Sequence, residues 1–205
     1  METENKIILP KSYLSWSSLN CWLSNPKRFR REYFEGLEKL NTRYLQYGKG
    51  IAKLIEEGKH KELLPDLITY ASSEFEIRAK IKGIPVLCYL DSYDPVKNVL
   101  REYKTGTQPW DMARVQKHDQ LTFYAAALKS AYGKMPEYCD LDWIETKEDK
   151  SSKGGLQNSG AINVTGRIIS FHREFDEREL ERIEDLILKV AEEISDAYKE
   201  FIKEL

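Results

Sequence analysis

The chain has 205 residues, of which 41% are hydrophobic and 32% are charged, and this length suits one well-packed domain better than two. Its formal net charge is only -2, which excludes a general attraction to nucleic acid, so any such binding needs a local basic patch. The sequence has neither an apolar leader after the start METENKIILPKS nor a window of about 18 apolar residues. We therefore expect a cytoplasmic protein without a membrane partner.

Residues 15–23 carry apolar side chains at helical spacing and predict a first helix. Asn25 followed by Pro26 offers an N-cap with proline at the first helical position, so a second helix is expected to begin there. Two further helices are predicted over 44–57 and 63–80, because apolar side chains again recur on one side. The apolar positions of the latter segment are Leu64, Leu67, Ile68, Ala71 and Phe75. The front of the chain is thus expected to be mostly helical.

The hydrophobic pattern changes in the middle of the chain. Segments 84–90 and 96–104 are rich in β-forming residues, and the turn composition of 91–95 between them predicts a hairpin. The segment 111–132 returns to a helical pattern. The three cysteines, at positions 21, 88 and 139, lie far apart in apolar surroundings and predict buried thiols in a reducing compartment, with no disulfide framework.

Two more strands are predicted over 138–146 and 161–171. The stretch KEDKSSKGGLQNSG between them is polar and rich in glycine, which predicts a mobile loop. Asp176 with Glu179 three residues later forms a capping box, and a long apolar stripe follows it to the end of the chain. A long closing helix is therefore expected.

This order of elements predicts a mixed α/β (α+β) domain, with a central mixed β-sheet flanked by helices on both sides and a helical N-terminal segment. We expect a single domain over 1–205, made of a mainly helical front (1–82), a core that carries the motifs (83–132), and closing strands with the C-terminal helix (133–205). A fold of this kind is compatible with several unrelated functions, so the function has to be inferred from particular residues.

The stretch VLREYKTGT places charged residues at the end of a predicted strand. Residues two apart on a strand face the same side, so Glu102 and Lys104 point together, and Asp91 at the end of the preceding strand can lie beside them. Two carboxylates and a lysine suit metal-assisted phosphodiester cleavage, in which a hard cation needs oxygen ligands and a lysine orients or deprotonates the attacking water. The alternative is a cross-strand salt bridge on a solvated surface.

Three segments in order carry a resemblance to a known family: PVLCYLD ending at Asp91, VLREYKTG with Glu102 and Lys104, and QLTFY with Gln120 and Tyr124. They resemble the PD-(D/E)XK nuclease superfamily, in particular its RecB-like branch, which includes exonucleases and CRISPR-associated nucleases. The resemblance implies a restriction-endonuclease-like fold. It covers residues 13–128 and extends only in outline to the last third of the chain.

Upstream segments add to the resemblance and also depart from it. The segment SYLSWSSLNCWLSNPKRFRREYFEGL is similar to the opening of the family, and YGKGIAKLIE is similar to its G-x-x-x-H-x-x-x-E helix. Ala52 stands where that helix has a histidine metal ligand, whereas Glu56 is kept. Asn25 stands where the iron–sulfur members have a cysteine, so no iron–sulfur cluster is expected.

The resemblance implies roles for each site residue. Asp91, Glu102, the carbonyl of Tyr103 and Glu56 would hold Mg²⁺ or Mn²⁺, and Lys104 would align the nucleophile. The residues expected in catalysis are Asp91, Glu102, Lys104, Gln120 and Tyr124. Other interpretations stay open, because Glu56 could belong to the polar side of an amphipathic helix. Gln120 and Tyr124 could be an ordinary helical pair that borders the core.

The basic run Lys27, Arg28, Arg30 and Arg31 lies beside tryptophans and is the best candidate for contacts with phosphate groups. Such runs also occur as ordinary solvated surface. Of the three histidines, His118 and His172 are expected on helix flanks or on the surface, and the role of His60, which lies beside lysines, stays open.

The predicted function is that of a Mg²⁺-dependent nuclease acting on DNA, either as an exonuclease or as an endonuclease, in DNA repair, recombination or the processing of phage or mobile-element DNA. DNA is the expected partner, and a helicase or recombination protein is a second one. One alternative is a nucleic-acid-binding or assembly subunit that retains the fold without turnover. Another is a helical interaction protein in which the E-x-K pair has no catalytic role.

Overall fold

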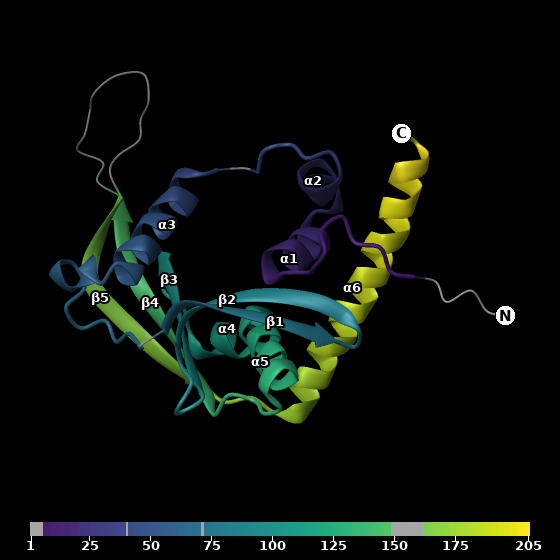
Figure 1. Ribbon diagram of the computed structural model, residues 1–205. Helices are drawn as coiled ribbons and strands as arrows, with labels where there is room; N and C mark the ends of the chain where they lie inside the picture. Colours follow the sequence, from purple (N-terminus) through teal and green to yellow (C-terminus); the bar gives the residue numbers. More distant parts are fainter. Residues whose placement is uncertain (1–5, 40, 71, 149–161) are drawn as a thin grey trace, which may run out of the picture.

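The computed structural model describes residues 6–39, 41–70, 72–148 and 162–205, in which one mixed sheet is covered by helices on both faces (Figure 1). The strands are β1 (Ser72–Ile81), β2 (Ile84–Asp94), β3 (Val99–Gly106), β4 (Tyr138–Glu148) and β5 (Ile162–Arg173). The helices are α1 (Trp16–Ser24), α2 (Pro26–Phe29), α3 (Arg43–Glu56), α4 (Met112–Gln116), α5 (Asp119–Tyr132) and α6 (Glu177–Lys203), with a π-helical turn η1 (Arg30–Phe34) and a 3₁₀ turn η2 (Lys59–Glu62).

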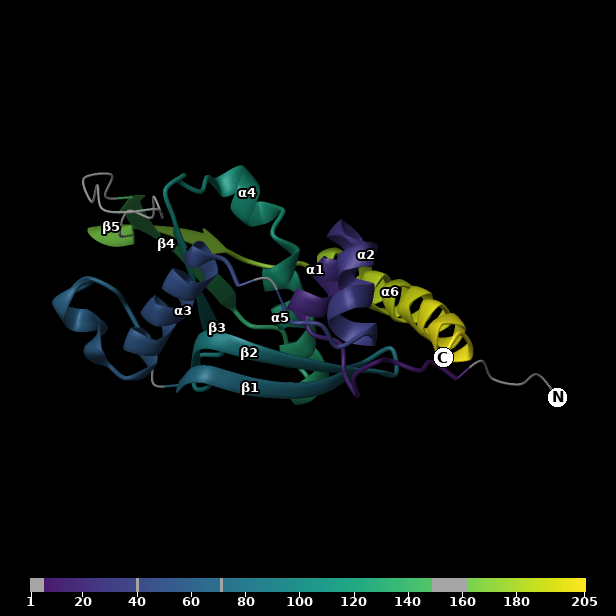
Figure 2. The ribbon, with the colours of Figure 1, turned by 90° about the horizontal axis from the view of Figure 1, so that it is seen from above.

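The strands lie in the sheet in the order in which they occur in the chain. All neighbouring pairs are antiparallel except β3 and β4, which run parallel. Parallel neighbours need a crossover connection, and α4 and α5 supply it between β3 and β4. Figure 2 shows β1 and β2 as a curved pair that diverges from the direction of β4 and β5.

The sheet forks between β2 and β3. Their pairing is limited to three residue pairs, from Asp94 opposite Val99 to Ser92 opposite Arg101. Beyond that point β2 continues its pairing with β1, and β3 continues its pairing with β4. The next residues past the last pair are Asp91 and Glu102, which therefore stand at the point where the two strands separate.

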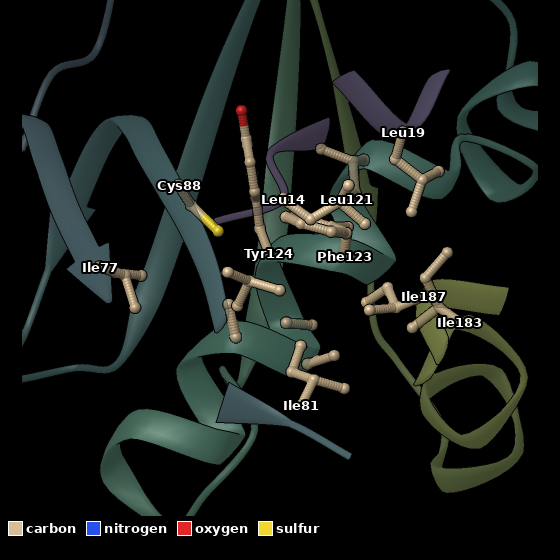
Figure 3. Packing of buried hydrophobic residues seen from close by; sticks show 14 of the residues in the cluster. Leu14, Leu19, Ile77, Ile81, Cys88, Leu121, Phe123, Tyr124, Ile183 and Ile187 are labelled. Atoms are coloured by element: carbon tan, nitrogen blue, oxygen red, sulfur yellow. The ribbon is translucent and has the colours of Figure 1, made fainter. Parts of the chain in front are cut away.

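The main core lies where α5 packs against β1 and β2, and buried side chains of α6 and α1 belong to the same cluster (Figure 3). Leu121 and Phe123 of α5 and Ile183 and Ile187 of α6 are buried in this core. Tyr124 is 7% exposed, and Figure 3 shows its ring beside the apolar cluster while its hydroxyl points away from the other labelled side chains. One helix thus contributes to the core and presents polar atoms at its edge.

A smaller apolar cluster covers the other face of the sheet. Ile51 and Ile55 of α3 pack there with Ile144 of β4, and Tyr103 of β3 lies partly buried against them. Trp143, the neighbour of Ile144, belongs to the main core on the opposite face, as the alternation of side chains along a strand requires. The expected sandwich of helices on both faces of a mixed sheet is confirmed.

The helix predicted over 63–80 is wrong, because its second half is the strand β1. The sequence SSEFEIRAKI alternates polar and apolar residues, and nine residue pairs with β2 fix it in the extended form. Phe75 and Ile77 consequently point into the main core, whereas Glu76 is exposed. The predicted turn at 91–95 also begins later, because β2 runs on to Asp94.

Local capping signals are confirmed. Asn25 caps α2 through its side chain with Pro26 at the first helical position, and Asp176 with Glu179 forms the capping box of α6. The helix predicted over 111–132 is interrupted near His118, which gives the two helices α4 and α5. Most of the loop predicted from KEDKSSKGGLQNSG, residues 149–160, lies outside the described residues.

The three cysteines are buried and free, as expected. None of the helices within the described ranges combines the length and the apolar character needed to cross a lipid bilayer.

Candidate active site

Asp91 and Tyr103 meet at the fork between β2 and β3. The Oδ2 atom of Asp91 accepts a hydrogen bond from the backbone amide of Tyr103 at 2.8 Å. This bond joins the two strands one step beyond their last regular pair, and it holds the Asp91 carboxylate beside the end of β3. Glu102, directly before Tyr103, is only 2% exposed. The predicted proximity of Asp91 to the E-x-K segment is therefore found in the structure.

Lys104 links β3 to α5. Its ammonium group forms an ion pair with Glu102 on the same face of the strand, and it donates to the Oε1 atom of Gln120 at 2.8 Å. The Nε2 atom of Gln120 in turn donates to the hydroxyl of Tyr124 at 2.6 Å, one helical turn further along α5. Glu102, Lys104, Gln120 and Tyr124 thus form one continuous chain of hydrogen bonds.

A cavity of about 460 Å³ opens onto these groups between α3 and the strands β1, β2 and β3. It brings together residues of five elements, namely α3, β1, β2, β3 and α5. Its lining includes the predicted residues Glu56, Asp91, Glu102, Tyr103, Lys104 and Gln120, together with Tyr44, Leu45, Gly48, Lys49, Ile51, Ala52, Ile55, Ser73, Glu74 and Thr105. Tyr124 is not one of the lining residues and is connected to the site through its hydrogen bond with Gln120.

Glu74 is the site residue that the sequence analysis missed. It lies on β1 between Ser73, which pairs with Ser92, and Phe75, which pairs with Leu90, so it stands opposite Asp91. Its φ angle of 48° is in the left-handed region, which a glutamate rarely adopts outside a constrained position. The alternating sequence SEFEI is compatible with a strand, but the apolar residues of the same segment also recur at helical spacing and predict a helix.

The carboxylates of this site repel one another in the absence of a cation. Burial is the main cause that raises the pKa of Asp91 well above its ordinary value, and the charge of Glu102 raises it further. Burial also raises the pKa of Glu74, with additional contributions from the charges of Glu56 and Glu102. Close carboxylates favour protonation or the binding of a positive ion. The cavity is therefore suited to bind a cation.

Lys104 carries a positive charge at neutral pH. Its burial lowers the pKa, but the charges of Glu102 and Asp91 and the hydrogen bond to Glu102 outweigh that effect, so the pKa lies above its ordinary value. A lysine in this state can orient and stabilise negative groups but has no free lone pair to accept a proton. Of the two roles that the sequence left open, orientation is the one that this geometry favours.

The residues present suit a small hard cation. The Oε2 atom of Glu102 is buried and has no hydrogen-bond partner among the described residues, so one ligand atom is available beside Asp91. Within the same described part of the chain, no three His, Cys, Asp or Glu side chains are grouped closely enough to enclose a metal by themselves. Mg²⁺ commonly binds through one or two carboxylates and keeps several waters. Asp91 and Glu102 supply two such carboxylates, and the carbonyl of Tyr103 remains a predicted third ligand.

The predicted basic patch lies outside the cavity, on α2 and η1. Two of its four members are engaged with carboxylates, because Arg28 pairs with Glu32 at 2.6 Å and Arg30 pairs with Glu204 at 2.8 Å. Lys27 and Arg31 are exposed. The structure therefore separates this patch from the carboxylates, and its proposed contact with phosphate remains a prediction.

A model of the PD-(D/E)XK nuclease superfamily matches residues 52–202, which is more than half of the chain. The chain belongs to this superfamily. Its members are generally dependent on divalent metals, in agreement with the oxygen-rich site at the fork. The match begins at Ala52, the position where the RecB-like pattern has a histidine. No curated protein matches the sequence.

Several solved structures share the fold. A phage-related exonuclease from Haemophilus somnus 129PT is similar with a TM-score of 0.56 and 14% identity, over 88% of this chain and 82% of that one. A putative exonuclease from Eubacterium rectale gives a TM-score of 0.55 and 12% identity, over 89% and 82%. The alkaline exonuclease LHK-Exo from Laribacter hongkongensis gives 0.50 and 13%, over 94% and 93%. At these identities the superfamily fold alone is shared.

Replacing Asp91 with asparagine is predicted to stabilise the metal-free protein at neutral pH. Asparagine can still accept the bond from the amide of Tyr103, while the charge that Glu102 and Glu74 repel is removed. The pKa of Asp91 is raised in the folded state, so its contribution to stability is complete below its unfolded pKa and is lost as the pH rises through its folded pKa. The gain should therefore be present at pH 7 and vanish in acid.

We expect the free energy of unfolding of Asp91→Asn to exceed that of wild type by about 1 kcal/mol or more at pH 7, which is roughly 2–4 °C in Tm for a chain of this size. Thermal unfolding in EDTA across this pH range measures it, with the exposed Asp66→Asn as the matched control. A variant that is no more stable than wild type at pH 7 would show that the charge of Asp91 is already compensated in the protein.

Proposed function

We propose that the protein is a divalent-metal-dependent DNA nuclease that hydrolyses phosphodiester bonds, with Mg²⁺ or Mn²⁺ as the cofactor. The observation that carries this proposal is the convergence of Asp91, Glu102 and Lys104 on one cavity at the fork of the sheet. Three of the similar structures are described as exonucleases, which supports cleavage from a strand end. DNA repair, recombination and phage DNA processing, with a helicase or recombination protein as partner, are the settings we propose for it.

Asp91, Glu102 and the carbonyl of Tyr103 would hold the cation, and Glu56 on α3 would contribute directly or through a water. When bound, a divalent cation lowers the pKa of water and offsets negative charge on the phosphate. The chain itself contributes carboxylates that are fixed before binding. Asp91 is held by the amide of Tyr103, and Glu102 is held by Lys104.

Lys104 would align the attacking water and offset the charge that develops on the phosphate. Its position is fixed from two sides, by Glu102 on its own strand and by Gln120 on α5. Tyr124 fixes Gln120 in turn, and burial in the core fixes Tyr124. Such a supported side chain loses little freedom when the substrate binds, which is how positioning lowers a reaction barrier.

A cleavage assay separates this function from that of a catalytically silent DNA-binding subunit. Labelled single-stranded, duplex and flapped DNA would be incubated with the purified protein in Mg²⁺, Mn²⁺ or EDTA. We expect cleavage with either cation and none with EDTA. Binding of DNA without cleavage under all three conditions would favour the silent subunit, for which Ala52 in place of the family histidine is the supporting observation.

Arg31 is predicted to contribute more to DNA binding than Arg28. Arg28 is paired with Glu32 and Arg30 with Glu204, whereas Arg31 is exposed and forms no ion pair with the described residues. Loss of one phosphate contact lowers the slope of log Kd against log salt by about 0.7 on a single strand. Fluorescence anisotropy at several salt concentrations should show this change for Arg31→Ala and a smaller one for Arg28→Ala. Equal slopes for wild type and Arg31→Ala would indicate that Arg31 makes no phosphate contact and that the patch is ordinary solvated surface.

A further inference from the structure

The cavity of the proposed site has two unlike walls. The carboxylates and Lys104 form one wall, on the strands. The other wall is one face of α3, along which small and apolar residues recur at helical spacing. The α3 residues on this wall, other than Lys49 and Glu56, are Tyr44, Leu45, Gly48, Ile51, Ala52 and Ile55.

The apolar wall runs from solvent to the interior. Tyr44 is 54% exposed and Leu45 is 50% exposed at the start of α3, whereas Ile51 and Ile55 are buried further along. Gly48 lies beside the end of β3, since a Cβ atom at this position would be in ordinary van der Waals contact, 3.5 Å, with the Oγ1 atom of Thr105. The apolar surface is therefore continuous with the segment that carries Lys104.

Charge alone does not explain how a nucleic acid would enter this cavity. Its lining carries four carboxylates, Glu56, Glu74, Asp91 and Glu102, against two lysines. A phosphate group approaching the metal-free site is repelled by this excess of negative charge. A neutral part of the substrate must then provide favourable contact, and the α3 wall offers apolar and aromatic surface for it.

We propose, on the basis of the nuclease function above, that the cavity receives one unpaired nucleotide at the end of a DNA single strand. Its base would lie against Tyr44 and Leu45, and its phosphate would face Lys104. A base inside the cavity is separated from a second strand, because the cavity has room for one small ligand and not for a base pair. A volume of about 460 Å³ is in the range of pockets that hold one small ligand.

The aromatic contact predicts a measurable loss. Stacking of a base on an aromatic side chain strengthens binding by about 1–3 kcal/mol, which is roughly five- to 150-fold in Kd. We expect Tyr44→Ala to weaken binding of a single-stranded end by roughly tenfold, whereas Tyr44→Phe keeps the ring and should bind like wild type. Tyr132 on α5 has the same exposure of 54% and lies outside the cavity lining, so Tyr132→Ala is the matched control.

The decisive experiment combines the variants with a change in the DNA. Anisotropy in EDTA would measure the Kd of labelled single strands with a normal or an abasic terminal nucleotide, at either end. The abasic end should weaken binding to wild type and to Tyr132→Ala by about the same factor as Tyr44→Ala does. It should cause no further loss in Tyr44→Ala, because the base and the ring form one contact. Additive losses, or no loss in either case, would overturn the proposal.

Cleavage of linear and circular single strands in Mg²⁺ tests the requirement for an end. We expect linear strands to be degraded and closed circles to resist, and equal rates on both would overturn the proposed terminal nucleotide. The experiments distinguish a failure of the proposed terminal-nucleotide site from a failure of the proposed nuclease function. Coupling between Tyr44 and the terminal base without cleavage in Mg²⁺ or Mn²⁺ would contradict the nuclease function alone, whereas cleavage without this coupling would contradict the inference alone.

Discussion

Replacing Lys104 with alanine is expected to reduce turnover by about 10²-fold or more while DNA and the cation still bind. Lys104 is the only described lysine that is bonded to Glu102, and Gln120 holds it from the other side. Alanine removes the group that aligns the nucleophile and leaves the carboxylates in place. Single-turnover cleavage in saturating Mg²⁺ measures this effect independently of binding.

The same variant should respond more strongly to a cation than wild type does. Glu102 is only 2% exposed in the wild type, so removal of Lys104 leaves a buried carboxylate without its ionic partner, which should cost about 2 kcal/mol in the metal-free protein. Mg²⁺ can replace the lost positive charge, so the Tm increase on adding Mg²⁺ should be larger in Lys104→Ala. Lys129→Ala removes an exposed ion pair with Glu177 and provides the control. Cleavage by Lys104→Ala at the wild-type rate would falsify the role assigned to the lysine.

Replacing Glu102 with glutamine should strongly reduce both turnover and the response to the cation. Glutamine keeps the size of the side chain and an oxygen that can accept from Lys104, but it removes a charged ligand. We expect turnover to fall by about 10²- to 10³-fold, as for the loss of a group that stabilises charge in the transition state. Affinity for Mg²⁺ should fall by about tenfold or more, since even the partners of metal ligands contribute that much.

Calorimetry with Mg²⁺ and thermal unfolding with and without the cation measure this loss. Glu76→Gln is a matched control, because Glu76 lies on the exposed side of β1 and bonds Arg78 and Tyr89. The two site variants should therefore change the Mg²⁺ response in opposite directions, upward for Lys104→Ala and downward for Glu102→Gln. Equal responses in both variants would indicate that Glu102 and Lys104 form an ordinary salt bridge.

Much of the site could be predicted from the sequence because its key distances are local. The two-residue period of a strand places Glu102 and Lys104 on one face, and the helical period places Gln120 and Tyr124 on one side of α5. The position of Asp91 required one further step, the pairing of β2 with β3 next to it. The hydrogen bond from Tyr103 confirms that step.

Glu74 could not be placed in the same way. The segment around it shows apolar residues at helical spacing as well as alternation, and local preference alone does not decide between the two patterns. Pairing with β2 decides in favour of the strand, and it sets Glu74 opposite Asp91. That contact depends on tertiary structure, so the sequence pattern of the segment did not contain it.

The apolar wall of the cavity also depends on tertiary structure. The helix α3 was predicted, with Ile51 and Ile55 on its inner side, and the second apolar cluster confirms that orientation. The fork between β2 and β3 is what leaves the other part of this face, around Tyr44, beside an open cavity. The amphipathic pattern of α3 contains no information about the short pairing of β2 with β3. The cavity beside Tyr44 therefore could not be predicted from that pattern.

The most direct test of the central claim is single-turnover cleavage of labelled single-stranded DNA by wild type and Glu102→Gln, purified side by side and assayed in Mg²⁺ and in EDTA. We predict cleavage by wild type in Mg²⁺, none in EDTA, and at least a 10²-fold slower rate for Glu102→Gln. Cleavage at equal rates by the two proteins would contradict the claim that the carboxylates at the fork of the sheet form the active site.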